Sequence, residues 1–470
     1  MARTKLVCTL GPASASSSLV QGLVRAGTSV FRLNFSHGEP EEHARMVDLV
    51  REAEDATGKP LAVLVDLPGP KVRLGSVRAD PFTFRPGQRF ELRPEGNGDD
   101  RGASTTYPGL AGDLQVDDRV LLADGAVELT VSAIDGDVVQ TRCVAGGTVR
   151  SGQGVNVPAE RLGLPAVTDR DREGLVRALD LGADFVAQSF VRAPGDVREL
   201  RAAMGDRSVP IIAKIETRPA VDDIDGILVD ADAVMIARGD LGVELPMEQI
   251  PLIQKELIRA ARAAGRPAIV ATQMLESMIH SSRPTRAEAN DCANAVLDGA
   301  DAVMLSGETA VGDYPFESAR AASTIAGYVE SKGRLFETPA PPSRHANEGA
   351  AVAHAAASIP VDELGVVAIT CYTETGRTAR LLSAERPRVP VYAFVPPRDV
   401  QRIMCLQWGV EALPASPPTD TDGMIALMDK GLQSHGLADP GDAVVMAASS
   451  PAGRTTTNML KIHRVGSPVR

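Results

Sequence analysis

Short apolar runs alternate with helix-like segments along the first two thirds of the chain. The runs, rich in β-branched residues, are KLVCTL (5–10), SVFRLNF (29–35), LAVLVDL (61–67), DFVAQSF (184–190), VPIIAKIE (209–216), AVMIARGD (233–240), PAIVATQ (267–273) and AVMLSGE (302–308). Buried parallel strands have this pattern, and eight of them separated by helices predict a (β/α)8 barrel. Helix signals agree, because Thr285 to Glu288 forms a capping box and Gly265 and Gly299 fall at predicted helix ends.

One gap between predicted strands is too long for a simple barrel. More than a hundred residues separate positions 67 and 184, many of them valine, with turn pairs at Asp124-Gly125 and Asp135-Gly136. Such pairs favour β-hairpins. We therefore predict a catalytic barrel over residues 1–68 and 166–338, interrupted by an inserted β-rich lid domain over residues 69–165.

The α/β pattern restarts after a proline-rich linker, FETPAPPSRHANEG (336–349). The later runs are VVAIT (366–370), VPVYAF (389–394) and AVVMAA (443–448). These runs predict a C-terminal α/β domain over residues 345–470.

Composition narrows the class of protein. The chain has 470 residues with 61 acidic and 49 basic side chains, which argues against nucleic acid or an anionic membrane as the main partner. No apolar stretch reaches the roughly 20 residues of a bilayer span, and the N-terminus lacks a signal-peptide block, so we expect a cytoplasmic location. The five cysteines are odd in number and scattered, which disfavours a disulfide framework or a zinc site.

Polar residues collect where the predicted barrel strands end, the place where such barrels carry their catalytic groups. They are Arg32, Asn34, Asp66, Ser189, Lys214, Glu216, Arg238, Asp240, Thr272, Ser306 and Glu308. Any one of them could be an ordinary solvated strand end. Together they favour a site, because burying several charges costs several kcal/mol per ion unless a ligand or metal pairs with them.

The carboxylates among these residues indicate a hard metal. Glu216 and Asp240 end neighbouring strands and offer only oxygen ligands, which suits Mg²⁺ or Mn²⁺. Lys214 lies two residues before Glu216, so both side chains point to the same face of a strand. An ammonium group beside a metal suggests that a negatively charged group is transferred.

Anion-binding groups complete the predicted site. Gly239 and Gly242 in ARGDLGVELP (237–246) let backbone N–H groups approach a small anion such as a carboxylate. Arg32 and Arg73 carry the planar forks that suit phosphate. The chain contains no GxxxxGK[ST] motif, so a nucleotide would bind at the barrel mouth and not in a P-loop.

Several motifs, in order along the chain, resemble those of pyruvate kinases. They are TKLVCTLGPAS, FRLNFSHG, PAVTDRD, KIE, MIARGDLGVELP, ATQMLESMI, RPTRAEANDCANAVLDGADAVMLSGETAVGDYP and TETGRTAR. The resemblance covers nearly the whole chain. It implies transfer of a phosphoryl group from phosphoenolpyruvate to ADP with Mg²⁺ or Mn²⁺, giving pyruvate and ATP, and an allosteric homotetramer.

The resemblance also implies roles for individual residues. Lys214 would stabilise the phosphoryl group in flight, while Glu216 and Asp240 would hold Mg²⁺. The backbone of Gly239 and Asp240 would bind the substrate carboxylate. Thr272 would help to deliver a proton to the methylene carbon, through water and Ser306. Phosphate and nucleotide binding would fall to Arg32, Arg73, Asn34, His37 and Arg170.

The stretch VDLPGPKVRLG (65–75) departs from the common pattern of the family, which has Glu at the position of Lys71. Relatives with Glu generally require K⁺, held by residues that match Asn34, Ser36, Asp66 and the Leu67 carbonyl. Those with Lys generally do not. We predict that the Lys71 ammonium replaces K⁺ and that Asp66 balances its charge; alternatively, Lys71 caps the loop and faces solvent. Smaller departures are Thr217, Ala220 and Arg170.

A second predicted site lies in the C-terminal domain. TETGRTAR (373–380) follows a predicted strand and opens a helix, which suits phosphate. The family uses this loop for effectors, through residues that match Thr373, Thr375, Gly376, Arg377 and Thr378. Glu374 disfavours a bisphosphate, so we expect a sugar monophosphate or AMP. An ordinary helix cap is the alternative.

Other functions remain open from the sequence alone. A magnesium-dependent lyase or aldolase on a similar barrel would also use a Glu/Asp pair. It would not need Lys214 together with two phosphate-binding arginines. A catalytically inactive binding protein is disfavoured because every charged group that phosphoryl transfer requires is present. The apolar residues Met274, Leu275 and Met278 are interpreted as core.

Overall fold

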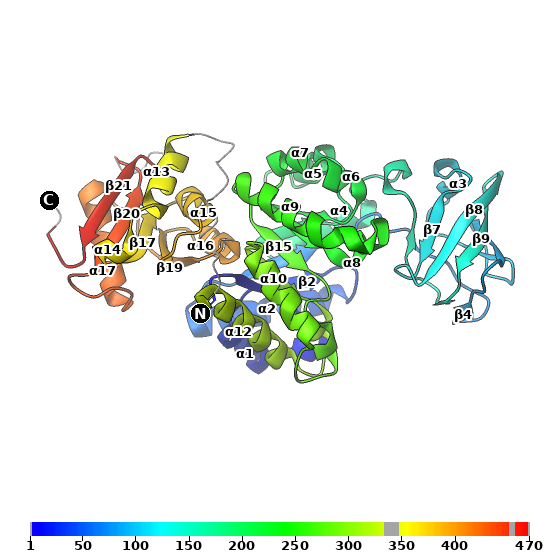
Figure 1. The fold of residues 1–470 in the computed structure, drawn as a ribbon, viewed down its shortest axis with the longest axis horizontal. Coiled ribbons are helices and arrows are strands. Elements are labelled where there is room, and N and C mark those ends of the chain that lie inside the picture. The colour runs from blue at the N-terminus through cyan, green and yellow to red at the C-terminus, as the bar shows by residue number, and fades with distance from the viewer. Residues whose placement is uncertain (1, 333–346, 451–455, 469–470) are drawn as a thin grey trace.

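The computed structural model describes residues 2–332, 347–450 and 456–468. Figure 1 shows three parts in a row: a barrel wrapped by helices in the centre, a small β-rich part at one end, and an α/β part with the C-terminus at the other. Part of the predicted linker, residues 336–346, lies outside the described residues.

Eight parallel strands close into the predicted barrel. Their order around it is β1-β16-β15-β14-β13-β12-β3-β2. Each predicted run coincides with one of the strands to within one residue or contains it. The strands are β1 (Lys5–Thr9), β2 (Thr28–Asn34), β3 (Ala62–Asp66), β12 (Phe185–Gln188), β13 (Ile211–Ile215), β14 (Ala233–Ala237), β15 (Ala268–Ala271) and β16 (Ala302–Leu305). The prediction of a (β/α)8 barrel is confirmed.

Helices follow the barrel strands and cover the outside of the barrel (Figure 1). They are α1 (Ser17–Ala26), α2 (Pro40–Thr57), α4 (Asp169–Asp180), α5 (Pro194–Ala203), α6 (Arg218–Asp222), α7 (Ile224–Asp230), α8 (Arg238–Glu244), α9 (Ile250–Ala263), α10 (Arg286–Leu297), α11 (Gly307–Ala310) and α12 (Pro315–Lys332), with short 3-10 turns η1 (Pro12–Ser14), η3 (Met247–Gln249) and η4 (Glu276–Ile279). The predicted capping box is present, since Thr285 accepts from the Glu288 N–H. Gly265 and Gly299 follow helices with positive φ, as helix-ending glycines do.

The amino-terminal end of the barrel is filled from another part of the chain. The 3-10 turn η5 (Met404–Leu406) places Cys405 and Leu406 in one apolar cluster with barrel-interior residues such as Val7 and Met235. Ser29 Oγ donates to the Cys405 carbonyl at 2.9 Å. Residues of the C-terminal part therefore close the amino-terminal end of the barrel core.

Between β3 and β12 the chain forms the insert, which we define as elements β4 to β11. Its strands are β4 (Phe82–Thr83), β5 (Arg89–Arg93), β6 (Gly102–Ser104), β7 (Arg119–Leu122), β8 (Val127–Asp135), β9 (Val138–Ala145), β10 (Thr148–Val149) and β11 (Val155–Asn156), with helix α3 (Leu110–Asp113); the 3-10 turn η2 (Ala159–Arg161) follows. They make a six-stranded and a two-stranded sheet around their own apolar core. The predicted hairpin turns at Asp124 and Asp135 join β7 to β8 and β8 to β9. The domain limits, 69–165 included, stay predictions.

The C-terminal part is a five-stranded sheet in the order β19-β18-β17-β20-β21. Its elements are α13 (Glu348–Ala357), α14 (Val361–Leu364), β17 (Val366–Tyr372), α15 (Arg377–Ala384), β18 (Val391–Val395), α16 (Arg398–Ile403), β19 (Val410–Pro414), α17 (Thr421–Ser434), β20 (Ala443–Ala448) and β21 (Met459–Arg464). The three predicted runs are its central strands. The sequence pattern did not predict β19 and β21, which are the sheet edges and carry exposed residues instead of a continuous apolar run.

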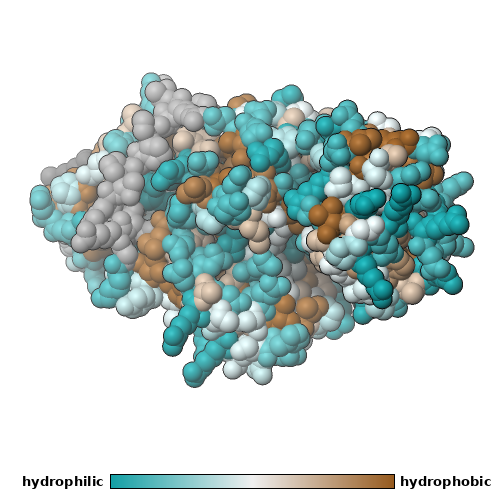
Figure 2. All heavy atoms as spheres, turned by 45° about the vertical axis from the view of Figure 1, so that its right-hand side comes forward, coloured by the Kyte–Doolittle hydropathy of each residue, from teal (hydrophilic) through white to brown (hydrophobic). Residues whose placement is uncertain are grey.

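The surface in Figure 2 is largely hydrophilic, and hydrophobic residues gather there in separate patches. Within the described residues, we find no helix with the length and apolar character needed to cross a membrane.

Candidate active site

The polar strand ends of the barrel meet around Asp66. Asp66 ends β3 and is 1% exposed. It accepts from Arg32 Nε at 2.8 Å, and Lys214 Nζ lies 3.2 Å from its other oxygen. Burial alone would raise the pKa of Asp66, but the positive charges of Lys214 and Arg32 outweigh it and hold this pKa below its usual range. Asp66 is therefore an anion that fixes two cations at the barrel mouth.

Lys214 points from β13 into the same cluster. Its Nζ lies 2.9 Å from Glu216 Oε1 and donates to Ser189 Oγ at 2.7 Å. Burial lowers the pKa of this ammonium group, yet the charges of Asp66 and Glu216 raise it above its usual value overall. Lys214 therefore stays positively charged here, and its contact with Glu216 agrees with the prediction that both side chains point to the same face of the strand.

One carboxylate oxygen of Glu216 pairs with Lys214, and the other accepts a backbone hydrogen bond. Its Oε2 accepts from the Phe190 N–H at 2.8 Å, and Phe190 has a left-handed φ of 55°. Thr217, the next residue, caps α6 by accepting from the Ala220 N–H. Burial raises the pKa of Glu216, and the negative charge of Asp240 adds to that effect. The positive charge near Glu216 is therefore too small to offset the cost of burying this carboxylate.

The loop after β15 contains strained backbone. Thr272 and Gln273 have φ of 70° and 54°, in a region that non-glycine residues rarely adopt and that is frequent at functional sites. Thr272 Oγ1 accepts from the Gly239 N–H at 2.8 Å. Arg238 donates to the Thr272 carbonyl at 2.8 Å and to Asp291 at 2.7 Å. These bonds fix the Thr272 hydroxyl beside the start of α8.

Glu308 connects this loop to the end of β16. It is 3% exposed and accepts from the Leu275 N–H at 3.0 Å and the Ser306 N–H at 2.7 Å. From the sequence, Glu308 was one of the polar strand ends without a predicted role. Its position braces the two loops that carry Thr272 and Ser306.

The prediction that Asp66 balances the charge of Lys71 is wrong. Lys71 Nζ lies 3.1 Å from Asp240 Oδ1 and 3.6 Å from Asp124 Oδ1 of the insert, and the ammonium faces the Phe190 ring at 5.8 Å from its centroid. Asp66 is instead paired with Arg32 and Lys214. The alternative, in which Lys71 faces solvent, is wrong too, since its side chain is 24% exposed and paired.

The oxygens expected to bind a monovalent cation have partners within the protein. Asn34 Oδ1 accepts from the Ser36 N–H at 3.1 Å, and the Leu67 carbonyl accepts from Ser189 Oγ at 2.7 Å. Asn34 and Asp66 are paired residues on neighbouring strands. These contacts bring Asn34, Asp66 and Leu67 to one side of the mouth.

The residues expected to bind phosphate and nucleotide are less concentrated. Arg32 donates through Nη1 to Thr9 Oγ1 at 3.1 Å in addition to its contacts with Asp66. Arg73 donates to the Gly152 carbonyl of the insert at 3.0 Å. His37 and Arg170 are exposed, and Arg170 lies in the first turn of α4. The structure places only Arg32 inside the charged cluster.

The residues at the mouth fit a hard divalent cation. Glu216 and Asp240 offer carboxylate oxygens, repel each other, and are each held by an ammonium group. In the described part of the chain, no group of three or more His, Cys, Asp or Glu is arranged to hold a metal ion. The two carboxylates are thus a partial ligand set, which substrate oxygens and water would complete.

The predicted effector loop has the expected local structure, but two of its hydroxyl groups are buried. Thr373 to Gly376 connect β17 to α15, and Gly376 has a φ of 76°. Thr378 Oγ1 lies 2.6 Å from Thr457 Oγ1, so this hydroxyl already has a partner. Glu374 accepts from the Tyr372 hydroxyl at 3.1 Å. Thr375 and Arg377 are exposed and accessible to a ligand.

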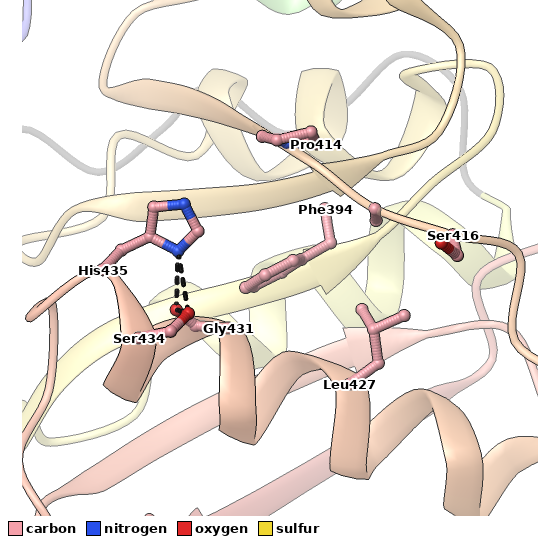
Figure 3. A pocket seen from close by; sticks show the side chains of 8 residues that line it. Phe394, Pro414, Ser416, Leu427, Gly431, Ser434 and His435 are labelled. Carbon is pink, nitrogen blue, oxygen red and sulfur yellow. Dashed lines mark hydrogen bonds between the residues drawn. The ribbon is translucent and has the colours of Figure 1, made fainter. Parts of the chain in front are cut away.

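A cavity of about 390 Å³ lies elsewhere in the C-terminal part, against α17. Figure 3 shows the Phe394 ring, from β18, beside Leu427 and over the turn of α17 that contains Gly431. A side chain at Gly431 would collide with that ring. The lining residues are Phe394, Pro414, Ala415, Ser416, Leu427, Gly431, Ser434 and His435. None is a carboxylate, lysine or arginine, which makes the cavity unsuited to phosphoryl chemistry.

Comparisons with known proteins agree over the length of the chain. The family model described as "Pyruvate kinase, barrel domain" matches residues 1–319, and the one described as "Pyruvate kinase, alpha/beta domain" matches residues 350–463. A curated protein of Mycobacterium intracellulare named pyruvate kinase is 45% identical, covering 99% of this chain and 98% of that protein. One of Geobacillus stearothermophilus with the same name is 41% identical over 98% of this chain and 80% of its own length.

A solved structure agrees as well. A crystal structure of a pyruvate kinase from Cryptosporidium parvum has a TM-score of 0.91 and 32% sequence identity, covering 99% of this chain and 96% of the other.

Proposed function

The chain belongs to the pyruvate kinase family of phosphotransferases, and from this premise we propose that it transfers the phosphoryl group of phosphoenolpyruvate to ADP, giving pyruvate and ATP. One observation carries the proposal: the ammonium of Lys214, whose side chain is only 12% exposed, lies between the carboxylates of Asp66 and Glu216 at the barrel mouth. Phosphoryl transfer needs little covalent chemistry from the protein and much neutralisation of charge in a fixed geometry.

We assign the roles as follows. Lys214 stabilises the phosphoryl group in flight, and Asp66 keeps Lys214 in place. Glu216 and Asp240 hold Mg²⁺ or Mn²⁺, which when bound neutralises charge on the substrate oxygens. The backbone around Gly239 and Asp240 binds the substrate carboxylate. The Gly239 N–H donates to Thr272 Oγ1, so the two groups are adjacent, and this N–H would exchange that bond for one to the substrate carboxylate.

The proton that converts the enolate to pyruvate requires a hydroxyl near the methylene carbon. We assign its delivery to Thr272, through water and Ser306. The braced and strained backbone at Thr272 supports this role, because such strain persists only where surrounding contacts hold it. Phosphate and nucleotide binding are assigned to Arg32, Arg73, Asn34, His37 and Arg170.

We propose that the insert acts as a lid that excludes water from the transferring phosphate. Lys71 supports this role, because its ammonium contacts Asp124 of the insert and Asp240 of the barrel. We also propose that the reaction does not require K⁺, since the Lys71 ammonium supplies a tethered positive charge at the mouth. The internal partners of Asn34 and Leu67 are consistent with this.

A coupled assay tests the reaction directly. Purified protein with phosphoenolpyruvate, ADP and Mg²⁺ is expected to form pyruvate, and removal of the divalent cation with EDTA is expected to abolish turnover. Restoration by Mg²⁺ or Mn²⁺ but not by Zn²⁺ would support the oxygen-only ligand set. Absence of pyruvate with both cations would contradict the proposal.

For the C-terminal loop, we propose a sugar monophosphate or AMP as effector, bound near Thr373, Thr375, Gly376, Arg377 and Thr378 in a cytoplasmic homotetramer. The exposed Thr375 and Arg377 at the start of α15 support an anion there. Titration of these compounds at subsaturating phosphoenolpyruvate is expected to shift the saturation curve. If none does, the loop has a structural role only.

A further inference from the structure

The Lys71 ammonium lies between the insert and the barrel. It contacts Asp240 on the barrel side at 3.1 Å and Asp124 on the insert side at 3.6 Å. We propose that Gly154 and Asp124 of the insert are positioning residues that determine where this ammonium lies. The inference rests on the proposed K⁺-independent phosphoryl transfer and adds two residues to it.

Gly154 leaves the space that the Lys71 side chain occupies. A Cβ at this position would lie 2.8 Å from Lys71 Cε and 3.6 Å from its Nζ. The backbone of Gly154 is outside the left-handed region, so its conformation does not itself require glycine. The requirement comes from Lys71, since a side chain at position 154 would collide with Lys71 Cε and displace the end of that side chain.

Gly154 is held in the insert by backbone hydrogen bonds. Its carbonyl accepts from the Ala123 N–H at 3.0 Å, and the next residue, Val155, donates to the Val72 carbonyl at 2.9 Å. Gly154 also forms an isolated bridge with Arg73. The segment at Gly154 that lies against Lys71 is therefore tied to the β7–β8 turn, which carries Asp124.

Asp124 adds an electrostatic attraction for Lys71 to the steric effect of Gly154. It has a left-handed φ of 54°, a conformation in which Asp and Asn are enriched over most residues. Its side chain is 73% exposed, so its attraction for Lys71 is weak and screened by salt. Asp124 therefore biases the ammonium toward the insert without locking it there.

On the barrel side, the same ammonium contacts one carboxylate of the proposed metal site and lies near the backbone partner of the other. It pairs directly with Asp240, and it lies over the ring of Phe190, whose N–H donates to Glu216. A shift of Lys71 should therefore be felt at both carboxylates. The insert controls the charge at the mouth through one lysine.

The test compares Gly154→Ala with Gly112→Ala. Gly112 lies in α3 of the insert, its backbone is outside the left-handed region, and a Cβ there meets nothing within 4 Å. The matched control therefore adds the same methyl group without touching Lys71. Asp124→Asn removes the charge and keeps a residue that suits the left-handed backbone.

Two quantities are measured for each variant. One is the ratio of kcat/KM for phosphoenolpyruvate with and without K⁺ at matched ionic strength. The other is the dissociation constant of Mn²⁺ without substrates, followed by electron paramagnetic resonance. For Gly154→Ala we expect the K⁺ ratio to rise about tenfold over the control and the Mn²⁺ constant to change at least about threefold, because a unit charge moves beside a metal ligand. For Asp124→Asn we expect a rise of about two- to threefold in the K⁺ ratio.

The inference is overturned if K⁺ stimulates Gly154→Ala no more than Gly112→Ala, or if these two variants bind Mn²⁺ equally. Strong K⁺ stimulation of the unsubstituted protein is a different result. It would contradict the proposed K⁺ independence, whereas the positioning role is judged only on the difference between the two alanine variants.

Discussion

The two ends of the barrel are built from the same strands and closed in opposite ways. At the carboxyl end, the charged side chains of Asp66, Lys214 and Glu216 are at most 12% exposed and pair with one another. At the amino end, Cys405 and Leu406 of η5 fill the barrel interior. Burying charges is costly, whereas burying Leu and Cys is favourable. The comparison indicates that the amino end supplies stability and the carboxyl end carries the chemistry, the usual division in this fold.

Ion pairs join the amino end to the C-terminal part and strengthen the contrast. Arg386 pairs with Asp301 at 2.9 Å, with both side chains at most 8% exposed, and its guanidinium lies 4.8 Å from the Trp408 ring centroid. Glu54 accepts from Arg402 Nε at 3.1 Å. Each of these charges is satisfied within the protein, whereas Glu216 and Asp240, although paired with Lys214 and Lys71, would in the proposed mechanism also hold a metal.

The largest effect is expected at the carboxyl end. Lys214→Met should reduce kcat by about 10³-fold or more, because one preorganised charge stabiliser is typically worth roughly 3 to 4 kcal/mol. Steady-state kinetics measure the loss, and circular dichroism verifies that the fold is kept. Exchange of the substrate's methyl protons should partly survive, since enolisation depends more on the metal than on Lys214. A kcat near that of the unsubstituted protein would remove Lys214 from the mechanism.

At the amino end the expected effect is on stability. Leu406→Ala should lower the free energy of unfolding by about 2 to 5 kcal/mol, because it leaves a cavity in a fully buried cluster. Trp408, the only tryptophan of the chain, is 4% exposed nearby, so its fluorescence follows urea unfolding of this junction. The kcat of the folded enzyme should stay near its original value.

Leu460→Ala is the control for that measurement, since Leu460 is 36% exposed on the edge strand β21. Its change should stay within about 0.5 kcal/mol. If Leu406→Ala were as stable as this control, or if it lost turnover without losing stability, the division between the two ends would be wrong.

A smaller effect is expected from Glu54, which is 1% exposed. Burial raises its pKa, but hydrogen bonds from Arg402 and the Leu61 N–H lower it more, so this pKa lies below its usual range. A carboxyl with a depressed pKa stabilises the folded state above its unfolded pKa of about 4.3, and that stability is lost as the pH falls through the folded pKa. Glu54→Gln should be less stable by about 1.5 to 3 kcal/mol at pH 7.

The difference in stability between the unsubstituted protein and Glu54→Gln should therefore shrink as the pH falls below about 4.3. Urea midpoints measured across the acid range give this difference directly. A difference that stays constant down to pH 3 would show that the Glu54 charge contributes nothing.

Much of the fold follows from local pattern. The eight apolar runs predict the barrel strands because a buried parallel strand must be apolar along its length. The edge strands β19 and β21 lack such runs, and so sequence pattern missed them. The closure of the barrel's amino-terminal end by Leu406 was also missed, since it joins residues that lie far apart along the chain.

For the site, too, local spacing was predicted correctly and contacts that depend on tertiary structure were not. The two-residue spacing of Lys214 and Glu216 predicts that both side chains lie on one face of the strand. Their 2.9 Å contact agrees with this prediction. The partner of Lys71 was predicted wrongly because the direction of the chain after Pro70 depends on the insert, and Asp240 lies 169 residues away. The sequence around Asp124 predicted only a turn, and the sequence around Gly154 indicated no role for that residue. Their positions relative to Lys71 arise from tertiary structure.

The central claim is that the barrel mouth transfers phosphoryl groups with a tethered lysine in place of K⁺. The most direct measurement is the rate of pyruvate formation from phosphoenolpyruvate and ADP with Mg²⁺, in tetramethylammonium buffer with and without K⁺ at matched ionic strength. We predict full activity without K⁺, and a gain of K⁺ dependence in Lys71→Glu, alone or combined with Leu67→Thr. Stimulation of the unsubstituted protein by K⁺ of more than about tenfold, equivalent to roughly 1.4 kcal/mol, would contradict the claim.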